Sequence, residues 1–326
     1  MIASRIVAPV VTSIAFVALS AAVTPALAQS FPSKPLRIVI GFTPGGGVDI
    51  NARLLAPKMS EILGQQVVVE NRPGAGTNIA NELVARAAPD GYTLLMNTAA
   101  VAINMSLYKK VGYDALKDFT PISVFSNSPN VLVIHSSVPV RTVKQLVALA
   151  QSRPGVLNYS SAGSGTTQHL SGELFKLRTA TNIVHIPYKG SAPSLTAIIG
   201  GESDMTFANI PAIYQHVKSG RLRPLGTTGL KRAEQLPDVP TFKESGYDVE
   251  VVVWYGVFAP SATPKEVIGV LSNAITKSAQ SPDIKQRLLD QGAEPVGNRP
   301  EEFAKDFREE LQRWAEVVRI SGARAD

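Results

Sequence analysis

Two glycine-rich turns contain the residues whose types and spacing could do chemistry. The first, Gly41–Asp49, reads GFTPGGGVD and directly follows the apolar run Ile38–Ile40. The second, Ala162–Thr167, follows the strand-like segment Leu157–Ser161 and precedes a helical pattern. A helix N-terminus has about four unpaired backbone N–H groups and a partial positive charge, and glycine lets that backbone approach an anion. Both turns therefore predict anion binding by backbone groups.

Neither turn fits the common nucleotide-binding or hydrolase motifs. A phosphate loop requires a lysine after its last glycine, and neither turn contains one. The dinucleotide pattern Gly-x-Gly-x-x-Gly fails at its last glycine in both turns. The hydrolase pattern Gly-x-Ser-x-Gly would require glycine at Ala162 and Thr166. Ser164 is therefore a poor nucleophile, and a secreted hydrolase using Ser164 with His169 is a minor alternative.

The histidines do not form a metal-binding pattern. His135, His169, His185 and His216 include no pair of histidines four residues apart, so we expect neither a zinc site nor another cofactor. Only His169 lies beside a glycine-rich turn, at the start of a predicted helix. A role in capping or in orienting a ligand is favoured there over general base catalysis.

Several polar residues at the ends of predicted strands could contact a ligand. Asp49 could cap the helix that follows or touch the ligand, because Asp is a favoured N-cap residue. Asn97, Thr98 and Asn209 follow predicted strands and could either bind the ligand or cap loops. Tyr188 could line a cleft or pack against it.

The N-terminus has the composition of a secretory signal. Arg5 precedes the uncharged stretch Ile6–Val23, and Ala26-Leu27-Ala28 matches a cleavage site. We therefore predict a signal peptide over residues 1–28 and a periplasmic location, with an uncleaved anchor as the alternative.

Charge and cysteine content exclude several classes of function. Removal of the signal would lower the formal net charge from +6 to +5, and the basic residues are scattered rather than clustered. A nucleic-acid partner is therefore not expected. The chain has no cysteine, which excludes disulfides, thiolate catalysis and cysteine-based metal sites.

Strand-like and helix-like segments alternate through the chain. We expect strands at Leu36–Ile40, Val67–Glu70, Thr93–Met96, Ile122–Phe125, Val131–Ile134, Leu157–Ser161, Asn182–Ile186, Met205–Ala208, Leu222–Thr227 and Val249–Phe258. We expect helices at Asp49–Leu63, Thr77–Ala87, Thr142–Gln151, His169–Leu177 and Ser191–Gly200, and a tail of two helices, Pro264–Gln280 and Pro300–Ile320. This alternation predicts parallel sheets covered on both faces, and the chain length favours two lobes.

One face of the last predicted helix is apolar. Its members are Phe303, Phe307, Leu311, Trp314 and Val318. We interpret this stripe as core packing rather than as a surface for a partner.

Taken together, these segments resemble the Bug family, the extracytoplasmic solute-binding receptors of tripartite tricarboxylate transporters. The resemblance rests on GFTPGGGVDINARLLAPKMSEILGQQVVVENRPGAGTNIA, APDGYTLL, SSAGSGTTQHLSGELFK, IVHIPYKGSAPSLTAIIGGESDMTF, LPDVPTFKESGY and APSATPKEV, in this order over the mature chain. One departure is Val48, which stands where the family often has threonine.

The resemblance implies an α/β fold of the type II periplasmic binding protein class. It has two lobes, each a mainly parallel sheet flanked by helices, joined by two crossing strands. By this likeness one lobe spans residues 30–131 with 253–326, and the other spans residues 132–252. The two β-rich stretches that could cross are Val131–Ile134 and Val251–Phe258.

The resemblance also implies a ligand carboxylate held mainly by backbone N–H groups of the two turns. On one side of the ligand, the site would comprise Phe42, Thr43, Gly46, Gly47 and Asp49. The other side would comprise Ser161, Gly163, Ser164, Gly165, Thr166, Thr167 and His169.

We therefore expect a monomeric periplasmic receptor that performs no catalysis and captures a small carboxylate between its lobes. The carboxylate could be an organic acid, a dicarboxylate, an amino acid or an aromatic acid. Membrane subunits of a tripartite tricarboxylate-type transporter would contact the receptor transiently, with a sensor kinase as the alternative partner.

Overall fold

The computed structural model describes residues 31–325. The predicted signal peptide lies outside these residues. Among the helices of residues 31–325, none combines the length and the apolar character that a membrane crossing requires.

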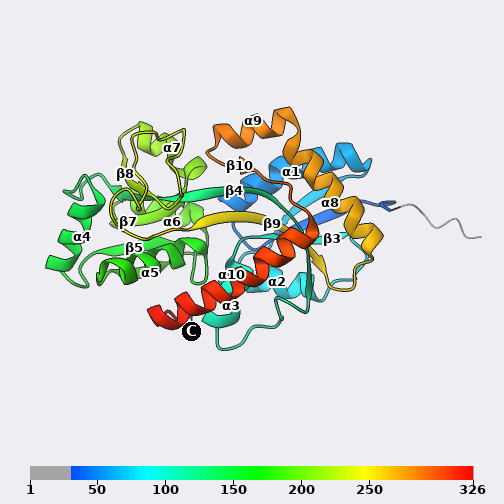
Figure 1. Ribbon diagram of the computed structural model, residues 1–326, viewed down its shortest axis with the longest axis horizontal. Helices are drawn as coiled ribbons and strands as arrows, with labels where there is room; N and C mark the ends of the chain where they lie inside the picture. Colours follow the sequence, from blue (N-terminus) through cyan, green and yellow to red (C-terminus); the bar gives the residue numbers. More distant parts are fainter. Residues whose placement is uncertain (1–30, 326) are drawn as a thin grey trace, which may run out of the picture. The chain divides into compact units, whose positions relative to one another are not determined.

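Strands and helices alternate along most of the described chain (Figure 1). The strands are β1 (Leu36–Ile40), β2 (Val67–Asn71), β3 (Thr93–Asn97), β4 (Phe119–His135), β5 (Asn158–Ser161), β6 (Val184–Pro187), β7 (Met205–Asn209), β8 (Leu222–Thr227), β9 (Val252–Pro260) and β10 (Glu294–Pro295). The α-helices are α1 (Gly47–Leu63), α2 (Asn78–Ala85), α3 (Ala100–Leu107), α4 (Val143–Ser152), α5 (Thr167–Thr179), α6 (Ser191–Ile199), α7 (Ile210–Lys218), α8 (Lys265–Gln280), α9 (Pro282–Asp290) and α10 (Pro300–Ser321). A short 3-10 turn, Ala75–Thr77, precedes α2.

The sheet is mixed, with parallel strands toward both ends and antiparallel strands in the middle. Its order is β2-β1-β3-β9-β4-β7-β5-β6, and β8 and β10 also pair with β4. β1 lies parallel to β2 and β3, and β5 lies parallel to β6 and β7. We call β1, β2 and β3 the first strand group and β5, β6 and β7 the second strand group.

β4 joins the two strand groups. It pairs antiparallel with β9 from Phe119 to Pro129 and then with β7 and β8 from Asn130 to His135. Figure 1 shows β4 and β9 side by side between the two groups. The prediction of two separate strands, Ile122–Phe125 and Val131–Ile134, is therefore wrong. The polar segment between them continues the ladder without interruption, and the two register shifts lie before it, between Pro121 and Ser123 and between Val124 and Ser126.

Three helices were missed by the sequence patterns. α3 and α7 follow β3 and β7, and α9 follows α8, so the prediction of a two-helix tail is wrong. α3 has the sequence AVAINMSL, in which six of eight residues are buried, so it shows no apolar face of helical period. α7 and α9 have nine residues each, and each carries a proline in its first turn.

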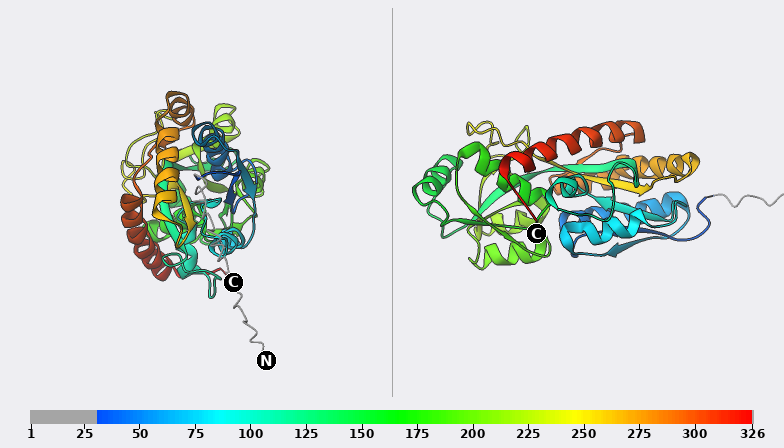
Figure 2. Two further views of the ribbon diagram at one scale, coloured as in Figure 1. Left: turned by 90° about the vertical axis from the view of Figure 1, so that its right-hand side faces the viewer. Right: turned by 90° about the horizontal axis from the view of Figure 1, so that it is seen from below.

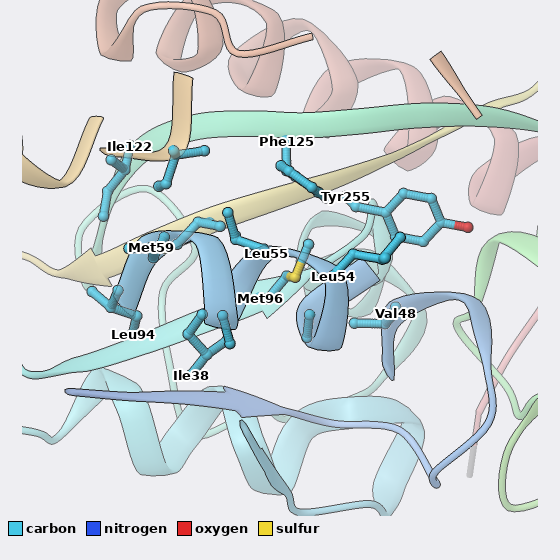
Figure 3. Packing of buried hydrophobic residues seen from close by; sticks show 14 of the residues in the cluster. Ile38, Val48, Leu54, Leu55, Met59, Leu94, Met96, Ile122, Phe125 and Tyr255 are labelled. Atoms are coloured by element: carbon cyan, nitrogen blue, oxygen red, sulfur yellow. The ribbon is translucent and has the colours of Figure 1, made fainter. Parts of the chain in front are cut away.

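Buried apolar residues form clusters against both strand groups. In the cluster drawn in Figure 3, α1 packs on the first strand group, with Leu55 and Met59 fully buried. The predicted stripe on α10 is core packing: Phe303 and Phe307 belong to a cluster with β3 and β9, whereas Trp314 and Val318 belong to a cluster with β5 and α5. α10 therefore contributes to apolar clusters of both strand groups, and the second view in Figure 2 shows it running along one side of the fold toward the middle. The lobe boundaries that the resemblance implies stay a prediction.

Candidate functional site

A small hollow of about 20 Å³ lies where several helices begin. Within residues 31–325 none of its lining residues is charged. A cavity of roughly 10–15 Å³ is enough for one water molecule, so this space fits a group of a few atoms. The lining consists of Phe42, Gly47, Val48, Thr98, Ala162, Thr166, Thr167, Gln168, Ser191, Asn209, Val253 and Tyr255.

Helix α1 presents free backbone donors to the small hollow. α1 begins at Gly47 after its N-cap, Gly46, and no side chain caps it. The first backbone N–H that bonds within the helix is that of Ile50, which donates to the Gly46 carbonyl at 2.9 Å. The N–H groups of Gly47 and Val48 have no hydrogen-bond partner among the described residues.

Helix α5 presents a second set of donors. Its N-cap, Thr166, accepts a hydrogen bond from the His169 N–H at 3.3 Å. The N–H groups of Thr167 and Gln168 have no partner within residues 31–325, and both residues line the small hollow. The partial positive ends of two helices thus meet at one hollow that contains no charged side chain.

Asp49 holds the first turn in place without lining the hollow. Its carboxylate accepts hydrogen bonds from the Gly45 N–H at 3.0 Å, from Asn71 at 2.9 Å and from the Arg53 guanidinium at 3.0 Å. Burial alone would raise the pKa of Asp49, but these hydrogen bonds and the charge of Arg53 together lower it below the usual 3.8. The interpretation of Asp49 as an N-cap is wrong, because Gly46 occupies that position and Asp49 reaches back from the first turn of α1.

Tyr255 contributes a hydroxyl group that the sequence analysis did not select. The residue is buried on β9, and its oxygen forms no hydrogen bond with any residue of the range 31–325. In Figure 3 its ring lies beside Val48, and its hydroxyl points away from the aliphatic cluster. A β-carbon placed on Gly47 would lie 2.6 Å from this oxygen and 2.7 Å from Oδ1 of Asn209. Burial raises the pKa of Tyr255, so the group is a neutral donor.

A large hollow of about 200 Å³ adjoins the small one and shares Phe42, Ala162 and Thr166 with it. Glycines, hydroxyl groups and one lysine dominate its walls. The other lining residues are Gly41, Gly74, Ala75, Gly76, Thr77, Tyr108, Gly163, Ser164, Pro187, Tyr188, Lys189 and Gly190.

Nine of the predicted site residues line one or both hollows. The small hollow contains Phe42, Gly47, Thr98, Thr166, Thr167 and Asn209, and the large one adds Gly163, Ser164 and Tyr188. Their predicted role in ligand binding stays a prediction.

The other predicted residues surround the hollows without lining them. This set consists of Thr43, Gly46, Asp49, Asn97, Ser161, Gly165 and His169. Asn97 is fully buried and bonds to Asn81 at 2.7 Å and to the Thr98 N–H at 2.8 Å, so it fixes the end of β3. Thr43 packs against Gly190 and has a buried hydroxyl without a partner among the described residues.

His169 and His185 lie stacked beneath the second turn. Their ring centroids are 4.0 Å apart, and burial lowers the pKa of each to about 3, with smaller contributions from nearby positive charge. Nδ1 of His169 accepts the Gly165 N–H at 3.2 Å, and Nε2 of His185 is 2.7 Å from the Ser161 hydroxyl. Both rings therefore order the turn as neutral groups.

The Ser164 hydroxyl has no base beside it. Both ring nitrogens of His169 face other groups, since Nδ1 bonds to Gly165 and Nε2 lies 4.0 Å from Glu173. The hydrogen bond between Ser164 and His169 that a hydrolase would need is absent from residues 31–325. In the same range, no group of three or more His, Cys, Asp or Glu residues could hold a metal ion.

The lining residues that the sequence analysis missed are Val48, Ala162, Gln168, Ser191, Val253 and Tyr255. Val48 and Gln168 could have been selected from the sequence, because each is the residue after a predicted site residue and carries the next backbone N–H of α1 or α5. Ser191 begins α6 after Gly190, which is another glycine-to-helix junction that could have been selected. Val253 and Tyr255 are two residues apart on β9 and so share one face of the strand. Only the pairing of β9 with distant strands reveals that this face meets the hollow.

The comparison with protein families decides what kind of protein this is. Residues 51–322 match the model of the tripartite tricarboxylate transporter family receptor, TctC. The chain belongs to this receptor family. The TctC chain is also similar to protein BugT of Bordetella pertussis, with 37% identity over 312 residues that cover 95% of this chain and 96% of BugT.

Solved structures of similar proteins share its fold. The Rhodopseudomonas palustris protein Rpa4515, solved with adipate, has a TM-score of 0.86 and 37% identity, covering 90% of this chain and 98% of Rpa4515. MatC (Rpa3494) of the same organism, solved with malate, has a TM-score of 0.83 and 31% identity, covering 88% of this chain and all of MatC. The predicted Bug-type resemblance and the two-lobe α/β fold are confirmed.

Proposed function

We propose that this TctC receptor is a periplasmic protein that binds a small carboxylate at the small hollow and delivers it to a tripartite tricarboxylate-type uptake system. The observation that carries the proposal is the meeting of the α1 and α5 N-termini at a hollow lined by no charged side chain. Free N–H groups and helix dipoles can hold an anion without a buried arginine.

Four backbone donors and one hydroxyl are available to a carboxylate. The donors are the N–H groups of Gly47 and Val48 on one side and of Thr167 and Gln168 on the other. Tyr255 adds a neutral O–H donor between them. Adipate and malate in the relatives' structures support an organic acid as the ligand here.

Ligand binding is tested directly by a thermal-shift screen of organic acids on the mature protein, followed by calorimetry. A ligand at 100 times its Kd stabilises the folded state by about 2.7 kcal/mol. Gly46→Asp should abolish binding, because it places bulk and negative charge at the N-cap of α1. Gly269→Asp is the matched control, since a side chain there enters open space. Unchanged affinity of Gly46→Asp for the best ligand would overturn this placement.

Tyr255→Phe provides a milder variant that preserves the shape of the site. A hydrogen bond to a charged group contributes about 1.5–3 kcal/mol, so loss of the hydroxyl should weaken binding by at least tenfold. An unchanged affinity would show that the Tyr255 hydroxyl does not bind the ligand. It would not contradict binding by the backbone N–H groups of α1 and α5.

The site suits capture and release better than catalysis, because Ser164 has no base beside it. Purified protein should therefore show ligand-dependent stabilisation and no turnover of carboxylic esters. Sustained ester hydrolysis that is lost in Ser164→Ala would contradict a receptor role.

We propose that the receptor is a monomer and contacts its membrane partner in the ligand-bound form. Pull-down from the membrane fraction with and without ligand distinguishes transporter subunits from a sensor kinase. The proposed periplasmic location predicts a mature N-terminus at Gln29, which N-terminal sequencing of the fractionated protein would check.

A further inference from the structure

We infer that the contacts between residues 229–236 and residues 289–294 form a latch that holds the two strand groups in the arrangement described above. Residues 229–236 follow β8, and residues 289–294 run from the end of α9 to the start of β10. We call these contacts the loop latch. Within residues 31–325 neither segment lines the small or the large hollow, so the loop latch acts from outside the candidate site.

The two segments of the loop latch pack on different strand groups. Leu288 and Ala293 belong to the apolar cluster of α1 and the first strand group. Leu236 belongs to a separate cluster with Ala208 of β7. Contacts between the segments therefore connect the first strand group to the second.

Two polar contacts join the segments. Nζ of Lys231 lies 2.6 Å from Oε1 of Glu294. The side-chain amide of Gln235 donates a hydrogen bond to the carbonyl of Leu289. Each contact has one member in each segment, so both would lengthen if the strand groups moved apart here.

An apolar contact places the loop latch close to the candidate site. Gly292 has a φ of +70°, and a β-carbon there would lie 2.7 Å from Cδ1 of Ile210, the first residue of α7. Ile210 is buried and directly follows Asn209, which lines the small hollow. A displacement at Gly292 therefore changes the packing of the residue next to the site.

The two segments also line a hollow of about 380 Å³. Its other walls come from the connecting strands, through Asn127 and Pro129 of β4 and Val252 of β9. Protein interiors are otherwise close-packed, with few voids larger than a water molecule. The hollow gives the segments room to approach or separate as β4 and β9 bend, and the contacts of the loop latch fix one separation.

The arrangement that the loop latch holds is the one in which the candidate site is assembled. The N-termini of α1 and α5 meet at the small hollow, and the hydroxyl of Tyr108, at the end of α3, donates to the Ser164 carbonyl at 3.4 Å. When only a fraction of the molecules has the binding arrangement, the apparent affinity is reduced by that fraction. The loop latch therefore raises affinity without touching the ligand. This effect on affinity rests on the proposed function, whereas the effect on the arrangement does not.

The arrangement is tested by pulsed electron paramagnetic resonance between two spin labels on the mature protein without ligand. The chain has no cysteine, so labels can be attached at Lys144→Cys on α4 and Asn273→Cys on α8, two exposed positions on helices that pack on different strand groups. Lys231→Glu and Glu294→Lys should each broaden or shift the distance distribution, because like charges then face each other. The double reversal should restore the wild-type distribution.

Lys34→Glu is the matched control. Lys34 lies just before β1 and forms an exposed ion pair of 3.5 Å with Asp90, which lies just before β3 in the same strand group. Its reversal should leave the distance distribution unchanged. If both single reversals of the loop latch give the wild-type distribution, or if the double reversal does not restore it, the inference is wrong.

Gly292→Ala tests the apolar contact by the same distance measurement. The added methyl group would press against Ile210 and should change the distribution. Gly220→Ala is its control, because Gly220 has a φ of +71° but nothing within 4 Å of its β-carbon. Equal distributions in the two variants would exclude the contact with Ile210 from the loop latch.

Calorimetry with malate and adipate measures the effect on binding. Lys231→Glu should weaken binding of whichever acid the wild type binds by up to about fivefold, and the double reversal should recover it. An unchanged affinity beside a changed distance distribution would contradict the effect of the loop latch on binding. If the wild type binds neither acid, the result counts against the proposed function, and the distance measurement still decides whether the loop latch holds the arrangement.

Discussion

A β-carbon on Gly47 would lie 2.6 Å from the hydroxyl oxygen of Tyr255, closer than any ordinary non-bonded contact. Gly47 is the first residue of α1, and Tyr255 lies on β9, one of the strands that connect the two strand groups. The start of the helix and the strand therefore fit together only because residue 47 has no side chain. This close approach places the free N–H of Gly47 beside the hydroxyl group.

Gly47→Ala should weaken carboxylate binding by at least tenfold, because α1 or Tyr255 must shift to make room for the methyl group. Tyr255 packs in the core and cannot move aside easily. Calorimetry measures the effect. Gly269→Ala is the control, since its β-carbon meets nothing within 4 Å and it lies inside α8. That control should raise stability by about 0.5–1 kcal/mol without changing affinity. Equal affinities for the two variants would contradict the tight fit at Gly47.

The turns could be predicted from sequence because their signals are local. Gly41–Gly47 and Gly163–Thr166 stand between apolar strands and helix starts, and both helices begin within two residues of the predicted positions. Tyr255 could not be selected in this way, because its contact with Gly47 depends on the pairing of β9 with β3 and β4.

The long strand β4 was divided in the prediction for a physical reason. Pro121 and Pro129 lack a backbone N–H, and prolines normally mark strand ends. The structure tolerates them because the ladder shifts register near Pro121 and β4 changes partners after Pro129. Such compensation depends on neighbouring strands and leaves no local signal.

Asp49→Asn should lower the free energy of unfolding at pH 7 by about 1–2 kcal/mol, because the first turn loses charge-assisted hydrogen bonds. The pKa of Asp49 is lowered by folding, so this stabilisation is present above the unfolded value near 3.8 and is lost as the pH falls below it. Urea unfolding of both proteins at pH 7 and pH 3 should therefore show a difference that shrinks at the lower pH.

Asp248→Asn serves as the control for a surface ion pair, since Asp248 lies 3.5 Å from Arg178 and is largely exposed. It should change stability by less than about 0.5 kcal/mol. A pH-independent difference between wild type and Asp49→Asn would contradict the role assigned to the Asp49 carboxylate.

The stacked histidines should make the protein less stable in acid. The pKa of His169 and of His185 is about 3 when folded and near 6.5 when unfolded, so between these values the unfolded chain binds more protons. Stability is therefore fully present above pH 6.5 and falls as the pH decreases toward 3. The free energy of unfolding, measured with denaturant at several pH values between 7 and 4.5, should fall less steeply with decreasing pH in His185→Asn than in the wild type. An identical slope would mean that this ring is not buried in its neutral form.

Gly165→Ala should disrupt the contact between the second turn and α3. Gly165 has a φ of +85°, and its β-carbon would collide with Oδ1 of Asn104. Gly45→Ala is a matched control, because Gly45 has a φ of +83° but nothing within 4 Å of its β-carbon. Both variants carry similar backbone strain. If calorimetry shows a larger loss of carboxylate affinity in Gly165→Ala than in Gly45→Ala, the difference is due to the collision with Asn104. Equal losses would show that this contact is not needed for binding.

The continuity of β4 has a mechanical consequence. A flexible linker between two halves resists separation through entropy, whereas a pair of hydrogen-bonded strands resists bending through elastic deformation of its backbone. Because β4 and β9 stay paired from Phe119 to Pro129, a change of angle between the strand groups would bend an elastic pair of strands rather than a flexible linker. Such a joint returns to a defined resting angle without refolding any segment.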